Sequence, residues 1–288
     1  MLKVSVIIPT YRSWDYLSKC LEALDMQSLP KEEFEILVIN NDPSDTKPED
    51  ILLPNNAKLY FEKDPGSYCA RNLGVELAQS EIFAFTDADC IPDPQWLENG
   101  LRYLKNGADL VGGRVEFFKE KGGDELTYLF EKTFNFKQKR NVEERGQSIT
   151  ANLFCKRAVA EVIGPFKTKL LSGGDFEWTS RATSSGFNIV YGNDTLVLHP
   201  ARKKFSSLIS KKKRTSGGMY YRFFKDFGNF EKLKFTLNIL RPRVSLLLRK
   251  DIPLKERIKL FFAVWYLEWI GIKEMYLLAH QGKAAQRH

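Results

Sequence analysis

The sequence has few cysteines, and their spacing suits neither a metal site nor a disulfide framework. The four cysteines, Cys20, Cys69, Cys90 and Cys155, lie among apolar or small neighbours, and no Cys-x-x-Cys pair occurs. This pattern is typical of buried, reduced thiols and argues against a zinc ribbon or a disulfide-rich fold. We therefore expect a protein of the cytoplasm.

Long hydrophobic runs are also absent. The longest uninterrupted apolar run, residues 260–267, ends at Glu268 and is far shorter than the roughly 20 residues of a membrane-spanning helix. The strand-like segment at residues 4–8 ends at Pro9 and is too short for the apolar region of a signal peptide. We expect a chain that neither crosses a bilayer nor is exported.

Acidic residues are scarce near the C-terminus. Residues 201–288 hold 21 Lys and Arg against 6 Asp and Glu, a net charge of +15, whereas residues 1–200 hold 23 against 30, a net charge of −7. At 288 residues, the chain can form one large domain or one domain with an extension. The charge division predicts an acidic-leaning domain followed by a segment that meets nucleic acid or membrane headgroups.

Short β-rich runs alternate with helical patterns in the first part of the chain. Strands are expected at residues 4–8, 34–39, 58–61, 82–86 and 110–115, and helices after Ser13 and at residues 70–79 and 94–106. This alternation predicts an α/β fold with a mostly parallel sheet flanked by helices. Ligands of such folds bind outside the carboxyl ends of the strands.

A pair of acids follows one of these strands. Asp87 and Asp89 come directly after residues 82–86, within FTDADC. Two carboxylates at this spacing can face one ligand, and their hard oxygen atoms suit Mg²⁺ or Mn²⁺ carrying a diphosphate. Asp-x-Asp also occurs by chance as solvated loop carboxylates, so the neighbouring sequence has to decide between these interpretations.

Four segments resemble the family 2 glycosyltransferases of the GT-A fold, in the order of that family. They are VSVIIPTYRSWDYLSKCLEAL at 4–24, FEILVINNDPSD at 34–45, GSYCARNLGVELAQSEIFAFTDADCIPDPQWL at 66–97, and ANLFCKRAVAEVIGPF with SGGDFEWTSRATSSGFNIVYGNDTLVLHP within 151–200. The resemblance implies a Rossmann-like GT-A domain at residues 1–204. Residues 205–288 would then form a basic, apolar-rich helical extension.

The resemblance also implies an activity, the transfer of a sugar from a nucleotide-sugar donor to an acceptor hydroxyl with inversion. The acceptor would be a glycan or lipid-linked molecule of bacterial cell-envelope polysaccharide, lipopolysaccharide or glycolipid synthesis. Positions that match the family's donor site are Pro9, Thr10, Tyr11, Asn40, Asn41, Asp42, Arg71, Asp87, Ala88 and Asp89. Strand-end packing for Tyr11 and a surface salt bridge for Arg71 are the alternative interpretations.

The nucleotide base is left open by a departure from the family. Where the family has an acidic pair after the second strand, this chain has Asn40 and Asn41. A carboxylate only accepts hydrogen bonds, whereas an amide can donate or accept. UDP or dTDP sugars are the first expectation, GDP or CDP sugars stay open, and Asn-Asn-Asp-Pro also suits a turn.

Metal and base complete the implied site. The family assigns the last acid of the pair, Asp89, to an Mg²⁺ or Mn²⁺ ion, which His199 could complete unless it is a packed strand-end residue. Asp175 matches the family's catalytic base, and Glu177 is the second choice, although the acid often found before the base is Gly174 here. A helix N-cap is the alternative role for Asp175.

Two other classes of protein fit less well. A sugar nucleotidyltransferase would carry a Gly-rich phosphate loop after the first strand, where this chain has Pro-Thr-Tyr-Arg at 9–12. A nucleic-acid-binding protein would explain the basic tail but not the acidic segments before it. The tail interleaves its charges with apolar runs at 244–248 and 260–267, which favours an anionic membrane surface over nucleic acid. We expect a peripheral location at the inner membrane face, with a packed helical subdomain as the alternative.

Overall fold

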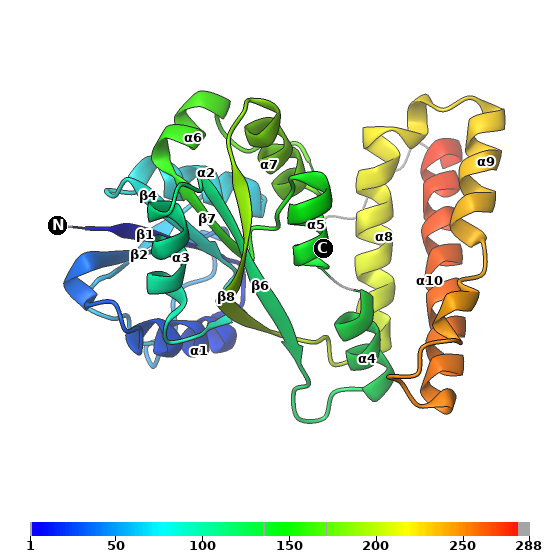
Figure 1. Ribbon diagram of the computed structural model, residues 1–288, viewed down its shortest axis with the longest axis horizontal. Coiled ribbons are helices and arrows are strands. Elements are labelled where there is room, and N and C mark those ends of the chain that lie inside the picture. The colour runs from blue at the N-terminus through cyan, green and yellow to red at the C-terminus, as the bar shows by residue number, and fades with distance from the viewer. Residues whose placement is uncertain (1, 135, 171, 282–288) are drawn as a thin grey trace. The chain divides into compact units, whose positions relative to one another are not determined.

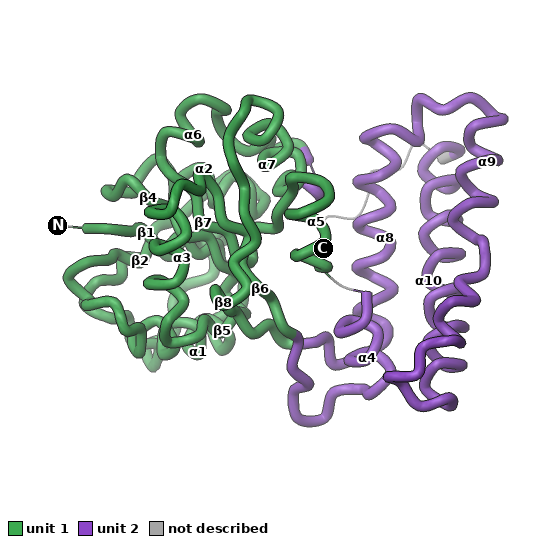
Figure 2. The backbone as a smooth tube through the Cα atoms, in the orientation of Figure 1, with its two compact units in different colours: residues 1–116, 136–169, 174–200 green, residues 117–135, 170–173, 201–288 purple. Residues whose placement is uncertain are grey.

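The protein's structure, a computed structural model, describes residues 2–134, 136–170 and 172–281 (Figure 1). The chain forms two compact units, which Figure 2 distinguishes by colour. The first unit comprises residues 1–116, 136–169 and 174–200, and the second comprises residues 117–135, 170–173 and 201–288. The second unit therefore draws on three separate parts of the sequence.

A mixed sheet forms the centre of the first unit. Its strands are β1 (Val4–Thr10), β2 (Phe34–Asn40), β3 (Ala57–Phe61), β4 (Ile82–Thr86), β5 (Ile91–Pro92), β6 (Leu110–Phe118), β7 (Asn152–Lys156) and β8 (Ile189–Pro200), in the order β3-β2-β1-β4-β7-β6-β8-β5. The five strands expected from the sequence are confirmed. The pairs β3–β2, β2–β1 and β1–β4 are parallel, and the pairs β4–β7, β7–β6 and β8–β5 are antiparallel.

Helices accompany the sheet of the first unit (Figure 1). They are α1 (Trp14–Asp25), η1 (Lys31–Glu33), α2 (Ser67–Leu77), α3 (Trp96–Lys105), α5 (Gln138–Arg145), α6 (Arg157–Ile163) and α7 (Gly174–Ser184). Every residue of β2 is buried, as expected for a strand of a sheet covered on both faces. Gly100 of α3 lies against Phe154 of β7, where an added Cβ would come within 2.4 Å of the ring.

The parallel half of the sheet brings several strand ends to one edge. Thr10 of β1 is in register with Asn40 of β2. Strand β4 pairs with β1 along Phe83–Phe85 and ends at Thr86, so its end lies near the ends of β1 and β2. The antiparallel strand β7 begins at this edge, since Asn152 is opposite Thr86. Loops that leave β1, β2 and β4 therefore share one end of the sheet.

The second unit is helical. It contains α4 (Glu125–Phe134), α8 (Phe205–Arg222), η2 (Phe224–Asp226), α9 (Asn229–Leu240), η3 (Val244–Leu246) and α10 (Leu254–Gln281). The long helix α10 packs on α4, α8 and α9, and its Ile272 and Met275 form a buried cluster with Phe224. None of the described helices combines the length and apolarity required to span a membrane.

A buried carboxylate joins separate segments of this second unit. Glu131 of α4 is fully buried and accepts a hydrogen bond from the backbone N–H of Arg202 at 2.6 Å. The Arg202 guanidinium lies 2.5 Å from the same carboxylate, and the ammonium of Lys211 in α8 lies 3.5 Å away. Burial, together with the nearby Arg202 charge, lowers the pKa of Lys211 to about 7. Glu131 thus offsets two cations that the fold brings together.

Removing this carboxylate should destabilise the second unit. We expect Glu131→Ala to lower the free energy of unfolding by about 3–5 kcal/mol, because it leaves buried cations without their counter-charge. Glu125→Ala is a matched control on the same helix, since the Glu125 side chain is 64% exposed. The control should change stability by less than about 0.5 kcal/mol. Denaturant unfolding followed by circular dichroism measures both, and equal losses would contradict this role for Glu131.

Candidate active site

The acid pair lies directly beyond the end of β4. The backbone N–H of Cys90 donates to the carbonyl of Asp87 at 3.0 Å, which forms a turn that leads into β5. Ala88, between the two acids, is buried in the core, while the side chains of Asp87 and Asp89 are 32% and 37% exposed. The turn therefore presents both carboxylates at the surface while the residue between them packs inward.

Asp87 is held by a buried arginine. The Nη2 atom of Arg71, in α2, lies 2.5 Å from Asp87 Oδ1, and the Arg71 side chain is only 5% exposed. Its guanidinium lies 5.8 Å from the centre of the Tyr68 ring. Its Nε is buried and has no hydrogen-bond partner among the described residues. The ion pair thus joins a buried guanidinium to a partly exposed carboxylate, which differs from a fully solvated surface salt bridge.

Asp89 faces a histidine of the neighbouring strand β8. The pairing of Ile91 with Leu198 in β5 and β8 places His199 Nε2 3.6 Å from Asp89 Oδ1. The other ring nitrogen, Nδ1, lies 2.8 Å from the carbonyl oxygen of Pro200, so Nδ1 must be the protonated donor. In a neutral ring, Nε2 then directs a lone pair toward a carboxylate. Two such acceptors facing each other suit a cation between them.

Cys90 lies close to this pair, because the ligand atoms of Asp89, Cys90 and His199 all lie within 4.8 Å of one another. The Cys90 thiol is fully buried and lies 3.9 Å from the carbonyl of Ala151. Burial, with the nearby Asp89 charge, raises the pKa of Cys90 well above its usual range. A protonated thiol is a poor metal ligand, so the carboxylate and imidazole are the better donor pair.

Asp175 lies in the first turn of α7. Its side chain is half-buried, and its Oδ1 accepts a hydrogen bond from the backbone N–H of Phe176 at 3.0 Å. Burial raises the pKa of Asp175, and the Asp87 charge adds to this rise while the Arg71 charge opposes it. These electrostatic interactions connect Asp175 with the Arg71–Asp87 pair. The arrangement suits a carboxylate that accepts a proton.

Gly174 has no room for a side chain. Its backbone N–H donates to the Tyr68 hydroxyl at 2.8 Å, and an added Cβ would lie 2.7 Å from two carbons of the Tyr68 ring. The same tyrosine packs on Arg71, and burial raises its pKa to about 12. The close approach of Tyr68 explains why glycine occupies the position where the family often has an acid.

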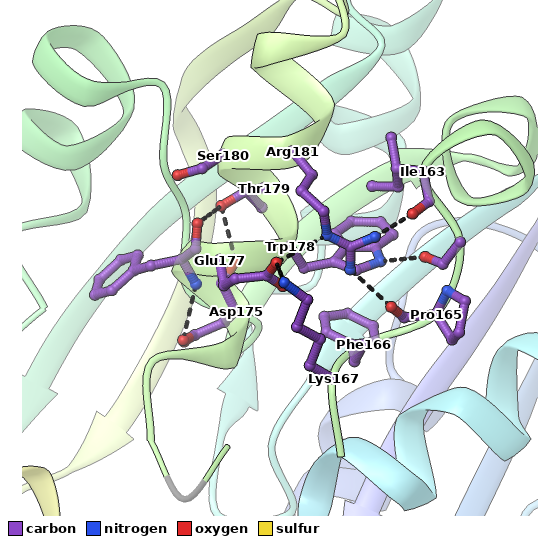
Figure 3. Close-up of polar contacts among 12 residues, drawn as sticks. Ile163, Pro165, Phe166, Lys167, Asp175, Glu177, Trp178, Thr179, Ser180 and Arg181 are labelled. Carbon is purple, nitrogen blue, oxygen red and sulfur yellow. Dashed lines mark hydrogen bonds and ion pairs between the residues drawn. The ribbon is translucent and has the colours of Figure 1, made fainter. Parts of the chain in front are cut away.

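Glu177 points away from Asp175, and its carboxylate forms ion pairs with two basic side chains (Figure 3). Its Oε1 lies 2.6 Å from Lys167 Nζ and 3.0 Å from Arg181 Nε. Arg181 also donates to the carbonyl of Pro165 at 2.7 Å. Glu177 therefore joins α7 to the loop after α6. The geometry favours Asp175 over Glu177 as the proton acceptor.

The two asparagines beyond β2 hold loops together. Asn40 Nδ2 donates to the Asp45 carbonyl at 2.7 Å, and Asn40 Oδ1 accepts from the Asp42 N–H at 3.0 Å. Asn41 Nδ2 donates to the Asp64 carbonyl at 2.7 Å, and its Oδ1 accepts from the Gly66 N–H at 2.5 Å. Both amides are thus engaged by backbone groups, which favours the loop-forming interpretation.

The other members of the expected donor site surround these loops. Asp42 accepts hydrogen bonds from the Ser44 hydroxyl at 2.6 Å and from Arg12 Nε at 2.7 Å, and these contacts lower the pKa of Asp42. At the end of β1, Tyr11 is 40% exposed, whereas Thr10 Oγ1 is buried and has no partner among the described residues. Pro9, in the same strand, is partly buried.

Sequence reasoning missed several residues that support this site. Tyr68 contacts both Arg71 and Gly174, and its position next to the Ala-Arg-Asn signature was the available signal. Phe166 stacks on Trp178 with ring centroids 4.6 Å apart and lies parallel to Tyr68 at 6.0 Å. Contacts between residues about 100 positions apart had no signal in a single sequence.

Solved structures with this arrangement identify the fold. The mannosyltransferase PcManGT from Pyrobaculum calidifontis, in complex with GDP-Man and Mn²⁺, matches 98% of this chain and 76% of its own, with a TM-score of 0.57 and 18% identity. Residues 1–349 of S. aureus TarS in complex with UDP match 98% of this chain and 92% of their own, with a TM-score of 0.54 and 18% identity. The fold is GT-A, as the sequence predicted.

Sequence comparison identifies the family. The model of glycosyl transferase family 2 matches residues 5–163. Glycosyltransferase AglE of Haloferax volcanii is 39% identical over 221 residues, which cover 75% of this chain and 72% of AglE. The dolichyl N-acetyl-alpha-D-glucosaminyl phosphate 3-beta-D-2,3-diacetamido-2,3-dideoxy-beta-D-glucuronosyltransferase of Methanococcus voltae is 25% identical over 222 residues, covering 67% of this chain and 65% of that protein. The chain belongs to glycosyl transferase family 2 and is a glycosyltransferase.

The contrast between the two acids of α7 predicts opposite effects on stability. Asp175→Asn should raise thermal stability near neutral pH, because the folded state raises the pKa of Asp175 above its unfolded value. Folding therefore favours the protonated acid, and stability is lost as the pH rises and the carboxylate ionises. Glu177→Gln should instead cost about 1–2 kcal/mol, since it weakens charge-assisted contacts with Lys167 and Arg181. Thermal melts at pH 7 measure both effects, and a destabilised Asp175→Asn would contradict the unfavourable burial of the Asp175 carboxylate.

Proposed function

We propose that this glycosyltransferase transfers a sugar from a nucleotide-sugar donor to an acceptor hydroxyl with inversion, assisted by a divalent cation. The observation that carries the proposal is the approach of Asp89 Oδ1 to His199 Nε2 at 3.6 Å, with Nδ1 of the histidine committed to the Pro200 carbonyl. Two acceptor atoms in this position, beyond the strand ends of a GT-A sheet, suit the metal of a nucleotide diphosphate.

The donor is expected to be a UDP or dTDP sugar, with GDP and CDP sugars as the alternatives. S. aureus TarS has been solved with UDP and with UDP-GlcNAc, and PcManGT with GDP-Man. The end of β1 would line the nucleotide pocket through Thr10, whose buried Oγ1 has no partner among the described residues, and through the exposed Tyr11 that follows it. Asn40 and Asn41 act by shaping the surrounding loops, since backbone groups occupy their amides.

Asp89 and His199 would hold the cation, either Mn²⁺ or Mg²⁺. An imidazole nitrogen is a softer ligand than a carboxylate oxygen, so we expect Mn²⁺ to serve better than Mg²⁺. When bound, the cation neutralises the charge that develops on the leaving diphosphate. This contribution requires no change in the protonation of the protein ligands.

The protein's own residues would orient the donor and accept the proton. Arg71 fixes Asp87 through the 2.5 Å ion pair, while its buried Nε retains hydrogen-bonding capacity for a polar group of the donor. Asp175 would take the proton of the attacking hydroxyl, as a single displacement with inversion requires a base on the acceptor side. Burial raises its pKa, so its ionised form accepts a proton more readily than a solvated aspartate does.

The acceptor is proposed to be a lipid-linked sugar or a growing envelope glycan. The Methanococcus voltae relative is named for a dolichyl N-acetyl-alpha-D-glucosaminyl phosphate, and S. aureus TarS is a poly(ribitol-phosphate) beta-N-acetylglucosaminyltransferase. Both acceptor types are anionic, which agrees with the excess of Lys and Arg in residues 201–288.

The metal assignment predicts a loss of metal-dependent donor binding. Asp89→Ala and His199→Ala should each weaken Mn²⁺-dependent binding by about 10–100-fold or more, because losing a direct ligand costs no less than losing an outer contact. Calorimetry with UDP-, dTDP-, GDP- and CDP-sugars, with and without Mn²⁺, measures this binding. The same titrations show which nucleotide the protein prefers. Asp50→Ala, at an exposed aspartate of the β2–β3 connection, is the control. Undiminished Mn²⁺-dependent binding by both variants would refute the assignment.

The base assignment predicts a separate loss of chemistry. Asp175→Asn should bind the donor normally while transfer falls by about 10²–10⁴-fold, the usual range for general base catalysis. In the wild type, kcat/KM should fall at acidic pH as Asp175 gains its proton, at a higher pH than for an ordinary aspartate because burial raises its pKa. If Glu177→Gln abolishes transfer while Asp175→Asn retains it, the two roles must be exchanged.

A further inference from the structure

Exposed apolar side chains are concentrated in the second unit. Among the described residues, 18 large apolar side chains are exposed, and 13 of them belong to this unit. They are Tyr221, Phe230, Leu233, Leu237, Val244, Leu248, Leu254, Ile258, Phe262, Trp265, Tyr266, Trp269 and Leu277. An apolar surface of this extent on one small helical unit is characteristic of a binding surface.

Helix α10 carries the longest part of this surface. Leu254, Ile258, Phe262, Trp265 and Trp269 recur at intervals of three and four residues, so they form one continuous stripe. We call this stripe the outer face of α10. Each of these five side chains is between 43% and 62% exposed.

The opposite side of α10 packs against the other helices of the second unit. Leu260, Val264, Leu267 and Met275 are buried, and α10 packs on α8 and α9, which flank it in Figure 1. A helix that is apolar on all sides is expected to be covered on all sides. The outer face therefore has apolar side chains that the second unit itself does not need.

The charges exposed on α10 are basic. Lys255, Lys259 and Lys273 are exposed. Lys255 and Lys259 directly follow Leu254 and Ile258 of the outer face, and Lys273 lies one helical turn after Trp269. Lys273 also lies 5.3 Å from the centre of the Trp269 ring. The outer face thus combines tryptophan and aliphatic side chains with lysines along its edge.

The acid nearest the middle of α10 is turned inward. Glu268 contacts Lys212 of α8, and its Oε1 lies 2.9 Å from Arg243 Nη2, so the carboxylate is only 14% exposed. The other two acids of the helix, Glu256 and Glu274, are partly buried. The three lysines are therefore exposed on α10, whereas its three acids are partly buried.

We propose that the outer face of α10 docks on an anionic lipid bilayer. Trp265 and Trp269 enter the boundary between headgroups and acyl chains, and Lys255, Lys259 and Lys273 lie over the anionic headgroups. This inference deepens the proposed function, because an enzyme held at a bilayer can reach a lipid-linked acceptor. The chemistry of the face identifies its partner as a bilayer. Its apolar side chains suit the acyl region, and the lysines along its edge suit anionic headgroups.

Other occupants suit this face less well. A second copy of the chain would bring together two tails that each carry a net charge of +15 over residues 201–288. A nucleic acid would require the lysines but would leave the apolar stripe in water. Helix α9 shows the same combination as the outer face of α10, because its exposed Phe230, Leu233 and Leu237 lie close in sequence to exposed Lys234.

The distribution of tryptophans provides a direct test with the full chain. The protein's other three tryptophans, Trp14, Trp96 and Trp178, are at most 8% exposed. Anionic vesicles should therefore blue-shift the emission of Trp265 and Trp269, and lipids brominated on the acyl chain should quench it. Binding should weaken when the salt concentration rises to about 0.5 M, since screening shortens the reach of exposed charges. No spectral change and no flotation with anionic vesicles at low salt would overturn the proposal.

Variants separate bilayer docking from other roles of the face. Trp265→Ser/Trp269→Ser and Lys255→Glu/Lys259→Glu should each weaken flotation with anionic vesicles about tenfold or more. The control Leu52→Ser/Val162→Ser removes comparably exposed apolar side chains, 83% and 66% exposed, from the first unit and should float as the wild type does. If the α10 variants instead change a dimer into a monomer and leave flotation unaffected, the face is a contact between copies and the proposal fails.

Slow hydrolysis of the nucleotide sugar, measured without vesicles, distinguishes this inference from the proposed function. The α10 variants should hydrolyse the donor at the wild-type rate, which also shows that they fold. Hydrolysis by a wild-type chain that ignores vesicles would overturn the membrane inference alone. Vesicle binding by a chain that neither binds nor hydrolyses any nucleotide sugar would overturn the proposed function alone.

Discussion

The ion pair between Arg71 and Asp87 is the contact on which the arrangement of the site depends. It joins α2 to the end of β4 inside the protein, where the Arg71 side chain is only 5% exposed. Tyr68 packs on the same guanidinium and accepts a hydrogen bond from the start of α7. In this way one buried cation determines where Asp87 lies and influences where α7 begins. The site thus keeps an internal positive charge that its own carboxylate partly offsets.

Strand pairing and ion pairs then give neighbouring acids different environments. Asp89, two residues beyond Asp87, turns toward His199 because β5 pairs with β8. Asp175 and Glu177, also two residues apart, differ because Glu177 is held by Lys167 and Arg181, whereas Asp175 retains a raised pKa in a half-buried position. The chemistry of each acid is therefore set by its contacts, since residue type and spacing alone are the same.

The sequence predicted the features that depend on local pattern. The five expected strands follow from short β-rich runs, and the location of Asp87 and Asp89 follows from the end of such a run. The ion pair of Glu177 with Lys167 and the contact of Glu268 with Lys212 could not be predicted, because these partners come from other parts of the chain. The loop-holding bonds of Asn41 reach residues 62–66, more than 20 positions away. Contacts of this kind require the three-dimensional arrangement.

The central claim is that Asp89 and His199 hold the cation that accompanies the donor diphosphate. A crystal structure of the full chain with UDP and Mn²⁺, with diffraction recorded near the manganese absorption edge, locates that cation without assumptions. The account predicts one anomalous peak at about 2.0–2.3 Å from both Asp89 Oδ1 and His199 Nε2, which is bonding distance for such ligands. A peak bound by other residues, with Asp89 and His199 in direct contact, would contradict it.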